Sequence, residues 1–282
     1  MLEFSKIHGA GNDFIIIDDS EQKWIRNATF IKKICDRHRG IGADGIIFLI
    51  STPEKSNTDF RMEFYNNDGY SVSMCGNGLR CVALFASKYL TDKRKFNIET
   101  EAGILSVNLL QEGEIQIQIP IIQFPEKLMI DSNAVFFSNT GVPHLVIIAD
   151  EDVQNLNITE LGKYWRNHKE FSPDGVNVNF ISNKFKIEKE IKIRTFERGV
   201  EAETCACGTG IAATALTLNT FFNLKPPFLF RTVDNDILTV DFYENCNTLL
   251  NDRKILLTGP AVEIFHGVLD KKYFAAFAEG DK

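Results

Sequence analysis

Two short stretches of the sequence share one pattern: Met74-Cys75-Gly76-Asn77-Gly78 and Ala206-Cys207-Gly208-Thr209-Gly210. Each places a cysteine before two glycines that are separated by one residue, and each runs directly into a segment rich in apolar residues. The stretches lie in opposite halves of a chain of 282 residues. The repeat therefore predicts two related halves, each with one cysteine at the start of a helix.

A cysteine at a helix start has a special environment. The first turn of a helix carries about half a positive charge and N–H groups without a helical partner. These features lower the pKa of a thiol and can also hold a substrate anion. A free cysteine is often only a buried structural thiol. The glycines favour a functional interpretation, because Gly76 and Gly78 weaken a helix but allow the backbone to approach a ligand closely.

The segments that follow the cysteines are apolar on nearly every side, over Asn77–Leu90 and Thr209–Phe222. A helix of this kind must be buried nearly all round. Short alternating or apolar runs on both sides of each helix indicate strands. We therefore predict an α/β (α+β) protein of two pseudo-symmetric domains, each a strand-rich, barrel-like sheet around a central apolar helix. A single mixed sheet with two packed helices is the alternative that periodicity alone leaves open.

Other elements can be placed from local signals. A short helix is expected over Thr29–Arg37, with Thr29 as its cap. Another is expected over Ile158–Lys169. Pro120 and Pro125 mark a crossing of the chain between the two halves.

The composition excludes several classes of protein. A net charge of −7 argues against a nucleic-acid partner, which requires a basic patch. The sequence has no apolar run of about 18 residues, so no membrane span is predicted. The N-terminus lacks a signal-peptide pattern, which predicts a cytoplasmic location. The six cysteines of such a chain are expected to be reduced thiols.

Two activated thiols that face one substrate suit proton exchange at carbon. One thiolate removes a proton, and a thiol on the opposite face supplies another, so the configuration is inverted without a cofactor. Such catalysis works best when the pKa of the group lies near the working pH, and a helix start brings a cysteine toward it. The same N–H groups could stabilise charge on a carboxylate beside the reacting carbon.

Further candidate residues come with ordinary alternatives. Glu197 and Arg198 follow a strand shortly before Cys207 and could be only a surface ion pair. Arg198 could instead bind a carboxylate through two hydrogen bonds, with Glu197 orienting a cysteine. His144 follows a turn and, taken alone, is more often structural. Asn12, Asn66 and Asn177 lie at turns or strand ends, where asparagine is routine.

Other kinds of site fit less well. Cys205 and Cys207 with His144 could supply three zinc ligands, but no second ligand pair supports a metal site, and none is predicted. A nucleophilic cysteine of a protease or transferase would leave the second cysteine motif without a role. The glycine-rich loop Gly40–Gly45 leads into a strand and not a helix, which excludes a dinucleotide site.

The sequence resembles the diaminopimelate epimerases, a family of pyridoxal-independent racemases, over almost its whole length. The resemblance lies in the opening Phe4–Phe14, in Arg37-His38 with Gly40–Gly45, in Phe64–Gly69, in Cys75–Cys81, in Glu197–Gly199 and in Ala206–Gly210.

The resemblance implies that the chain converts LL-2,6-diaminopimelate to the meso form, for lysine and peptidoglycan synthesis, with no cofactor. Cys75 and Cys207 would be the acid–base thiols, with His144 adjusting Cys75 and Glu197 adjusting Cys207. The residues implied to bind substrate are Asn12, Asn66, Gly76, Asn77, Asn177, Glu197, Arg198, Gly208 and Thr209.

The resemblance also implies an arrangement of the chain. The active site would lie in the cleft between the two domains. The C-terminal strand would return to the first domain, which gives an N-terminal domain of residues 1–122 plus 264–282 and a C-terminal domain of residues 123–263. Homodimers are common in the family, and the one other partner implied is the small amino-acid substrate.

Three departures from the family pattern bear on substrate choice. Val142 stands where many members have a substrate-binding asparagine, and valine cannot replace the hydrogen bonds of an amide. Gly45 stands where some members have a side chain that reaches the ligand. The loop before Cys207 is one residue longer than in many members and contains Cys205. A related amino-acid racemase of altered specificity and a non-enzymatic small-molecule binding protein remain as alternatives.

Overall fold

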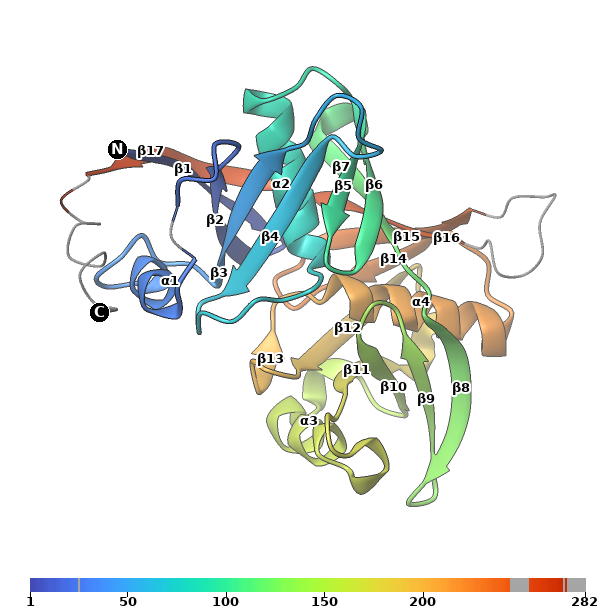
Figure 1. Ribbon diagram of the computed structural model, residues 1–282. Helices are drawn as coiled ribbons and strands as arrows, with labels where there is room; N and C mark the ends of the chain where they lie inside the picture. Colours follow the sequence, from blue (N-terminus) through green and yellow to red (C-terminus); the bar gives the residue numbers. More distant parts are fainter. Residues whose placement is uncertain (25, 244–253, 271, 273–282) are drawn as a thin grey trace. The chain divides into compact units, whose positions relative to one another are not determined.

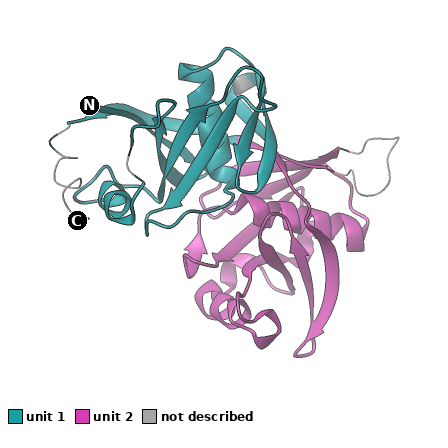
Figure 2. Ribbon diagram, viewed as in Figure 1, with its two compact units in different colours: residues 1–117, 260–282 teal, residues 118–259 magenta. Residues whose placement is uncertain are grey.

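The computed structural model describes the whole chain except residues 25, 244–253, 271 and 273–282. The chain divides into two compact units, shown in teal and magenta in Figure 2. Unit 1 consists of Met1–Ile117 with Pro260–Lys282, and unit 2 of Gln118–Gly259. The domain boundaries expected from sequence, after residues 122 and 263, differ from these by a few residues.

Unit 1 is built on a mixed sheet of short strands (Figure 1). Its strands are β1 (Leu2–Gly9), β2 (Asn12–Asp18), β3 (Gly45–Ser51), β4 (Phe60–Asn66), β5 (Lys95–Thr100), β6 (Gly103–Leu109), β7 (Glu114–Ile119) and β17 (Val262–Leu269). They pair in the order β17-β1-β2-β3-β4-β5-β6-β7. The β2–β3 and β4–β5 pairs are parallel and the others antiparallel.

Unit 2 repeats this plan. Its strands are β8 (Gln123–Ile130), β9 (Asn133–Asn139), β10 (Pro143–Ala149), β11 (Asn177–Ser182), β12 (Glu190–Glu197), β13 (Ala202–Thr204), β14 (Phe228–Arg231), β15 (Ile237–Tyr243) and β16 (Lys254–Pro260). They pair in the order β8-β9-β10-β11-β12-β14-β15-β16, with β13 added to β12. Here β10–β11 and β12–β14 are the parallel pairs.

The succession of parallel and antiparallel pairs from β1 to β7 is therefore the same as that from β9 to β16. The helices follow the same plan. Those of unit 1 are α1 (Ala28–Cys35) after β2 and α2 (Gly76–Tyr89) after β4; those of unit 2 are α3 (Ile158–Arg166) after β10 and α4 (Gly208–Phe222) after β12 and β13. Short 3₁₀ turns occupy Gln111–Gly113, Val153–Asn155, Lys169–Phe171 and Asn183–Lys186. Among the described residues, no helix has the length and apolar content that a membrane crossing requires.

The two cysteine motifs open the central helices, as the sequence predicted. Cys75 is the N-cap of α2 and Cys207 is the N-cap of α4. Every residue of α4 from Gly208 to Leu218 is buried, which confirms the prediction from its all-round apolar pattern. Helix α2 packs against β1, β2, β3, β6 and β17, and α4 packs against β8, β9, β10, β11 and β15.

Three local predictions need correction. Helix α1 begins at Ala28, because the Asn27 side chain, and not Thr29, accepts the N–H of Phe30 at 2.8 Å. Helix α3 ends at Arg166 with Asn167 as its C-cap, and a separate 3₁₀ turn begins at Lys169, the last residue expected to be helical. The crossing marked by Pro125 is strand β8, whose pairing is irregular between Gln123 and Glu126. Proline lacks an N–H group and is tolerated at such irregular positions.

Candidate active site

In unit 1, Cys75 lies at the positive end of α2 with its side chain turned back onto the helix. Its Sγ accepts the backbone N–H of Gly78 at 3.3 Å, and the residue is half-buried. The donated hydrogen and the helix dipole both favour a negatively charged sulfur at this position. The first turn of α2 therefore provides the environment that an acid–base thiolate requires.

The residue after the first glycine of the motif, Asn77, is held by a buried arginine. Asn77 is 2% exposed and its Oδ1 accepts a hydrogen bond from Arg80 Nη2 at 2.9 Å. Arg80 is fully buried, and its Nε donates to the carbonyl of Pro260 at 3.2 Å. The side chain of Asn77 is therefore oriented by a charge-assisted hydrogen bond within its own helix.

Asn12 and Asn66 stand at the ends of β2 and β4, the two strands that flank β3. Asn12 begins β2, and Asn66 ends β4 opposite Gly45 on β3. A Cβ at Gly45 would lie 2.5 Å from the ring of Phe64 and 2.6 Å from the carbonyl oxygen of Tyr65. Only glycine fits there, so its presence follows from packing and carries no information on the substrate.

An ion network fixes the loops beside these strand ends. Arg37 donates to both carboxylate oxygens of Asp13 at 2.9 Å and to Asp44 at 2.7 Å, and Lys6 lies 2.8 Å from Asp13. Burial opposes the charge on Asp13, but the hydrogen bonds from Arg37 and Lys6 outweigh it and hold the pKa of this carboxyl well below its usual value. The carbonyl of Asp44 also accepts the N–H of Asn67, so one network supports both segments.

In unit 2, Cys207 has a different environment from Cys75. It is 9% exposed and makes no capping hydrogen bond through its side chain. Its Sγ lies 3.4 Å from Thr209 Oγ1. Burial and the nearby negative charge of Glu197 raise the pKa of the Cys207 thiol, against the opposing effects of the Thr209 hydroxyl and the Gly210 N–H. Cys207 is therefore held as a thiol.

Glu197 and Arg198 lie at the end of β12, where the chain turns toward β13. Thr204 Oγ1 donates to Glu197 Oε1 at 2.7 Å. The backbone N–H of Arg198 donates to Asn177 Oδ1 at 2.8 Å, while Asn177 Nδ2 donates to the carbonyl of Pro143 at 3.3 Å. Asn177 thus joins the turn to the start of β10, and its predicted contact with substrate remains a prediction.

His144 is fully buried at the start of β10. Its Nε2 lies 2.9 Å from Thr209 Oγ1 and its Nδ1 lies 3.2 Å from Asn179 Nδ2. Burial, aided by the positive charge of Arg198, lowers the pKa of His144 to about 3. The imidazole is therefore neutral at ordinary pH. Its predicted pairing with Cys75 remains a prediction.

The predicted site residues thus form two groups, one in each unit. Unit 1 holds Asn12, Asn66, Cys75, Gly76 and Asn77; unit 2 holds His144, Asn177, Glu197, Arg198, Cys207, Gly208 and Thr209. Sequence reasoning missed Asn179 and Thr195, which contact the unit 2 group from adjacent strands. Each lies in a strand that also carries other polar residues, so the sequence pattern did not single them out.

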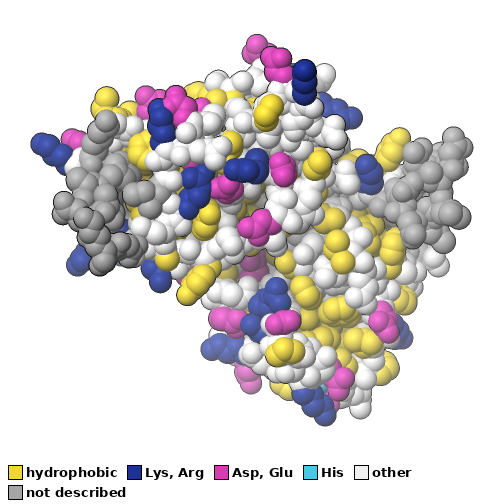
Figure 3. Space-filling view, viewed as in Figure 1, with side chains coloured by type: hydrophobic (Ala, Val, Ile, Leu, Met, Phe, Trp, Pro, Cys, Tyr) yellow, Lys and Arg dark blue, Asp and Glu magenta, His cyan; other side chains and the backbone are white. Residues whose placement is uncertain are grey.

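The described residues show no sign of a metal site or of a nucleic-acid surface on the face in Figure 3. No group of three or more His, Cys, Asp or Glu side chains among the described residues is placed to hold a metal. Cys246, one of the six cysteines, lies outside those residues. On the face shown in Figure 3, basic and acidic side chains are interspersed over each unit, and that face has no continuous basic stripe.

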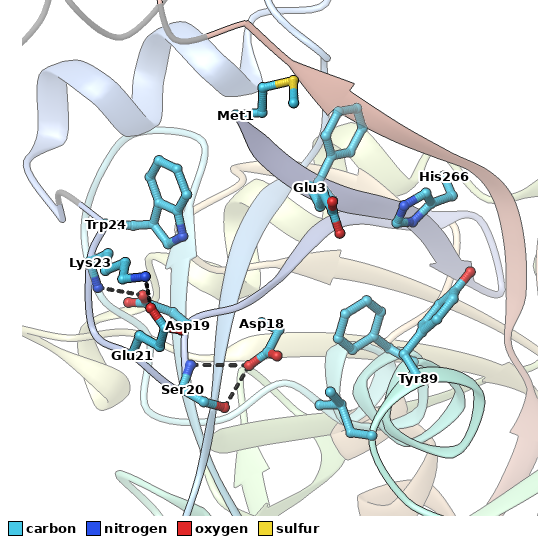
Figure 4. Close-up of a pocket in the computed structure, with 13 residues that line it drawn as sticks. Met1, Glu3, Asp18, Asp19, Ser20, Glu21, Lys23, Trp24, Tyr89 and His266 are labelled. Carbon is cyan, nitrogen blue, oxygen red and sulfur yellow. Dashed lines mark hydrogen bonds and ion pairs between the residues drawn. The ribbon is translucent and has the colours of Figure 1, made fainter.

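A cavity of about 570 Å³ lies in unit 1 between Trp24 and Tyr89 (Figure 4). None of the predicted site residues lines it. Two of its acidic side chains have partners: Asp18 accepts from Ser20, and Asp19 accepts the N–H of Lys23. The cavity is therefore separate from the chemistry expected of the cysteine motifs.

Several solved structures have the same fold as this chain. A phenazine biosynthesis protein of the PhzF family from Bacillus anthracis matches 95% of this chain and 99% of its own, with a TM-score of 0.71 and 16% sequence identity. A hydroxyproline epimerase from Agrobacterium vitis matches 94% of this chain and 90% of its own, with a TM-score of 0.67 and 14% identity. At these identities the likeness shows the fold alone.

The sequence itself shows the family. A family model described as diaminopimelate epimerase matches residues 4–120 and 136–242. The diaminopimelate epimerase of Aquifex aeolicus is 39% identical over 287 residues, which cover 96% of this chain and 99% of that protein. That of Flavobacterium psychrophilum is 36% identical over 265 residues, 94% of this chain and 98% of that protein. The chain belongs to the diaminopimelate epimerase family.

Proposed function

We propose that this chain is an isomerase that converts LL-2,6-diaminopimelate to meso-diaminopimelate, with Cys75 and Cys207 as the acid–base pair. Membership of the diaminopimelate epimerase family supports the reaction. The observation that carries the mechanism is the pair of N-cap cysteines at the starts of α2 and α4, in two units of the same topology. A mechanism that used one cysteine would leave the second cysteine motif without a role.

The two thiols differ in a way that suits the reaction. Cys75, which accepts the N–H of Gly78, takes the α-proton as a thiolate. Cys207, which burial and Glu197 keep protonated, gives a proton to the opposite face of the same carbon. In the reverse direction the roles exchange. After one turnover Cys75 carries the α-proton and Cys207 is the thiolate. Cys75 then releases a proton to solvent and Cys207 takes one up before the next turnover, so the scheme uses no separate cofactor.

The remaining predicted residues would hold the amino acid. Backbone N–H groups at Gly76 and Gly208 are suited to the carboxylate beside the reacting carbon, where negative charge develops. Arg198 is suited to a carboxylate through two hydrogen bonds. The residues proposed to bind the rest of the substrate are Asn12, Asn66, Asn77, Asn177, Glu197 and Thr209.

Several finer statements belong to the same proposal. The site would form in a cleft between two barrel-like halves, each wrapped around its central helix. The protein would act in the cytoplasm as a homodimer, in lysine and peptidoglycan precursor synthesis. These expectations rest on the family and on the sequence.

The runner-up is an amino-acid racemase with another substrate, and Val142 is the residue that favours it. Val142 lies in the turn before β10 and has no amide to offer a ligand. A panel of LL-diaminopimelate, meso-diaminopimelate, proline and trans-4-hydroxyproline, incubated in deuterated water without pyridoxal phosphate, separates the candidates.

The expected result of the panel is α-deuterium and interconversion with both LL- and meso-diaminopimelate, and no exchange in proline or trans-4-hydroxyproline. Exchange in proline or hydroxyproline but not in diaminopimelate would establish the racemase of altered specificity. Saturable binding of diaminopimelate without exchange would establish a binding protein. Either result would overturn the proposed function.

A further inference from the structure

A chain of buried polar side chains runs from the centre of unit 2 to Cys207. Thr195 Oγ1 donates to Asn179 Oδ1 at 3.0 Å, and Asn179 Nδ2 lies 3.2 Å from His144 Nδ1. His144 Nε2 lies 2.9 Å from Thr209 Oγ1, which lies 3.4 Å from Cys207 Sγ. Asn179 and His144 are both 0% exposed, so each of their polar atoms depends on these partners.

One backbone carbonyl fixes the direction of every hydrogen bond in this series of buried side chains. Asn179 Nδ2 donates to the carbonyl of Leu145 at 3.1 Å. A carbonyl only accepts, so the amide nitrogen and not the oxygen of Asn179 must face it. The same nitrogen faces His144 Nδ1, which must therefore accept. The neutral imidazole then carries its hydrogen on Nε2 and donates it to Thr209.

The direction continues to the sulfur. Because Thr209 Oγ1 accepts from His144, its own hydrogen is free to point toward Cys207 Sγ. A donated hydrogen stabilises the thiolate form of Cys207 at the moment it has given up its proton, and it does so without adding a charge. Without this donor, the transfer from Cys207 would leave a buried thiolate beside the carboxylate of Glu197.

The fit of helix α4 shows that this position is built for an amide. A Cβ placed on Gly210 would lie 2.0 Å from Asn179 Oδ1 and 3.0 Å from its Cγ. The second glycine of the motif is therefore needed so that α4 can lie directly on the Asn179 side chain. The helix that carries Cys207 and the side chain that orients His144 are thus packed as one piece.

We propose that Asn179 is a positioning residue for Cys207: it holds His144 as the Nε2–H tautomer, so that the Thr209 hydroxyl donates its hydrogen to the Cys207 sulfur. Its effect on turnover rests on the proposed function, whereas the tautomer and the thiol titration do not. The other groups that face this chain are Glu197 from β12, which acts on Cys207, and Arg198 from the following turn, which acts on His144.

The tautomer is tested first, by nitrogen NMR of protein with ¹⁵N-labelled histidine. The chain has five histidines, and the signal lost in a His144→Gln variant identifies His144. The expected spectrum shows a neutral ring protonated on Nε2, and it retains that state in Thr195→Val. A ring protonated on Nδ1, or charged near neutral pH, would overturn the proposal without any variant at Asn179.

The consequence for sulfur is tested with Asn179→Asp, which keeps the shape but presents an acceptor to His144 Nδ1. The hydrogen of the His144 ring is expected to move to Nδ1. The Thr209 hydroxyl is then expected to donate to His144 Nε2 and no longer to the Cys207 sulfur. The ultraviolet absorbance of thiolates, taken as the difference between each protein and its Cys207→Ser form, should move to higher pH. Turnover near neutral pH should fall about tenfold through kcat, with KM little changed.

The matched control is Asn97→Asp in unit 1. Asn97 also accepts from a hydroxyl, that of Ser106 at 2.8 Å, and donates to a backbone carbonyl, that of Asn57. It should leave the Cys207 titration and the pH profile of kcat as in the parent. If Asn179→Asp does not fold, the His144 tautomer in the parent and in Thr195→Val still tests the proposal.

A further outcome separates this proposal from the proposed function. If the parent lacks epimerase activity but Cys207 titrates as expected in Asn179→Asp and Asn97→Asp, the proposed function fails and the role of Asn179 stands. An unmoved Cys207 titration in folded Asn179→Asp would overturn that role.

Discussion

The two units share a topology but differ at equivalent positions beneath their cysteines. In unit 1, Ile16 pairs with Ile47 and Ile47 pairs with Phe64. In unit 2, the corresponding pairs are Val146 with Asn179 and Asn179 with Thr195. The second glycine of each motif confirms the match: a Cβ on Gly78 would meet Ile47, and one on Gly210 would meet Asn179.

The same register makes Phe14 the counterpart of His144. Phe14 pairs with Gly45 at the start of its parallel pair, and His144 pairs with Asn177 at the start of the other. Phe14 packs edge-to-face on Phe64, with ring centroids 5.5 Å apart, where unit 2 has the polar chain. The strands beneath the Cys75 helix therefore present apolar side chains, whereas those beneath the Cys207 helix present hydrogen-bonded polar side chains.

This difference shows how one fold can present two unequal thiols. In unit 1 the N–H of Gly78 at the helix start favours the charged form of Cys75. In unit 2 burial and Glu197 oppose the charge on Cys207, and Thr209 offsets part of that effect. A resting pair of one thiolate and one thiol is what proton exchange between two faces requires. Four predictions test this comparison.

The largest effect is expected from removing either thiol. Cys75→Ala and Cys207→Ala should each lower kcat by roughly 10²–10⁴-fold or more, because each face of the carbon loses its proton donor or acceptor. Cys35→Ala and Cys205→Ala, which remove thiols assigned no role, serve as matched controls and should retain most activity. Near-full activity in either of the first two variants, measured by chiral chromatography, would refute the two-base scheme.

A large effect on stability is expected at the ion network of unit 1. Asp13→Asn leaves Lys6, which is 4% exposed, with a buried charge and should lower the free energy of unfolding by about 3 kcal/mol or more. Since the pKa of Asp13 is lowered in the folded state, its contribution is present above about pH 4 and is lost as the pH falls below that.

The control for this network is an exposed ion pair. Lys23 and Glu21 have side chains 65% and 69% exposed, so Glu21→Gln should change stability by less than about 1 kcal/mol. Urea titrations at pH 7 compare the two variants. Equal stabilities would mean that the Asp13 network does not anchor unit 1.

The two motif glycines should respond differently to alanine. Gly210→Ala meets the amide of Asn179, which is held by Thr195 and Leu145, and should cost about 1–3 kcal/mol of stability. Gly78→Ala meets the flexible ends of Ile47 at 3.1 Å and Met62 at 3.3 Å, and lies at ordinary contact distance, 3.5 Å, from the Cys75 Cβ. The helix preference for alanine, about 1 kcal/mol, should nearly offset that contact. Thermal unfolding measures the stability of both variants. A larger loss of stability in Gly78→Ala than in Gly210→Ala would contradict the comparison.

The smallest effect is a pH dependence of stability that comes from His144 in unit 2. Its counterpart in unit 1, Phe14, does not titrate. The pKa of His144 is about 3 in the folded state, against about 6.5 when unfolded, so the unfolded chain binds one more proton between these values. Stability should therefore fall as the pH falls below about 6.5, by roughly 1.4 kcal/mol per pH unit from this residue.

Carboxylates also titrate in part of that range, so the matched comparison is with His144→Gln. Between pH 6 and 5, above the ordinary carboxylate range, the parent should lose stability with the steeper slope. Parallel slopes in urea titrations would mean that His144 is not buried as a neutral ring.

The sequence predicted the features that depend on local pattern. The cysteine–glycine motifs located both helix starts, because capping and all-round apolar character are readable over a few residues. The N-cap of α1 was misplaced by two residues, since Asn27 and Thr29 are both suitable caps and the choice depends on how the chain enters the helix.

What the sequence could not predict depends on strand register. Asn179 was not among the predicted site residues, and its neighbours His144 and Thr195 come from other strands. Only the pairing places these side chains together. For the same reason Gly45 looked like a departure at the substrate, although Phe64 from the adjacent strand is what excludes a side chain there.

The central claim is that two different thiols carry the proton on the two faces of one carbon. It is tested most directly by following LL-diaminopimelate at low conversion with enzyme equilibrated in deuterated water. The first meso product should carry deuterium at the inverted carbon, while the remaining LL substrate carries none. Meso product that retains the substrate's own hydrogen, or LL substrate that gains deuterium as fast as product forms, would contradict the claim.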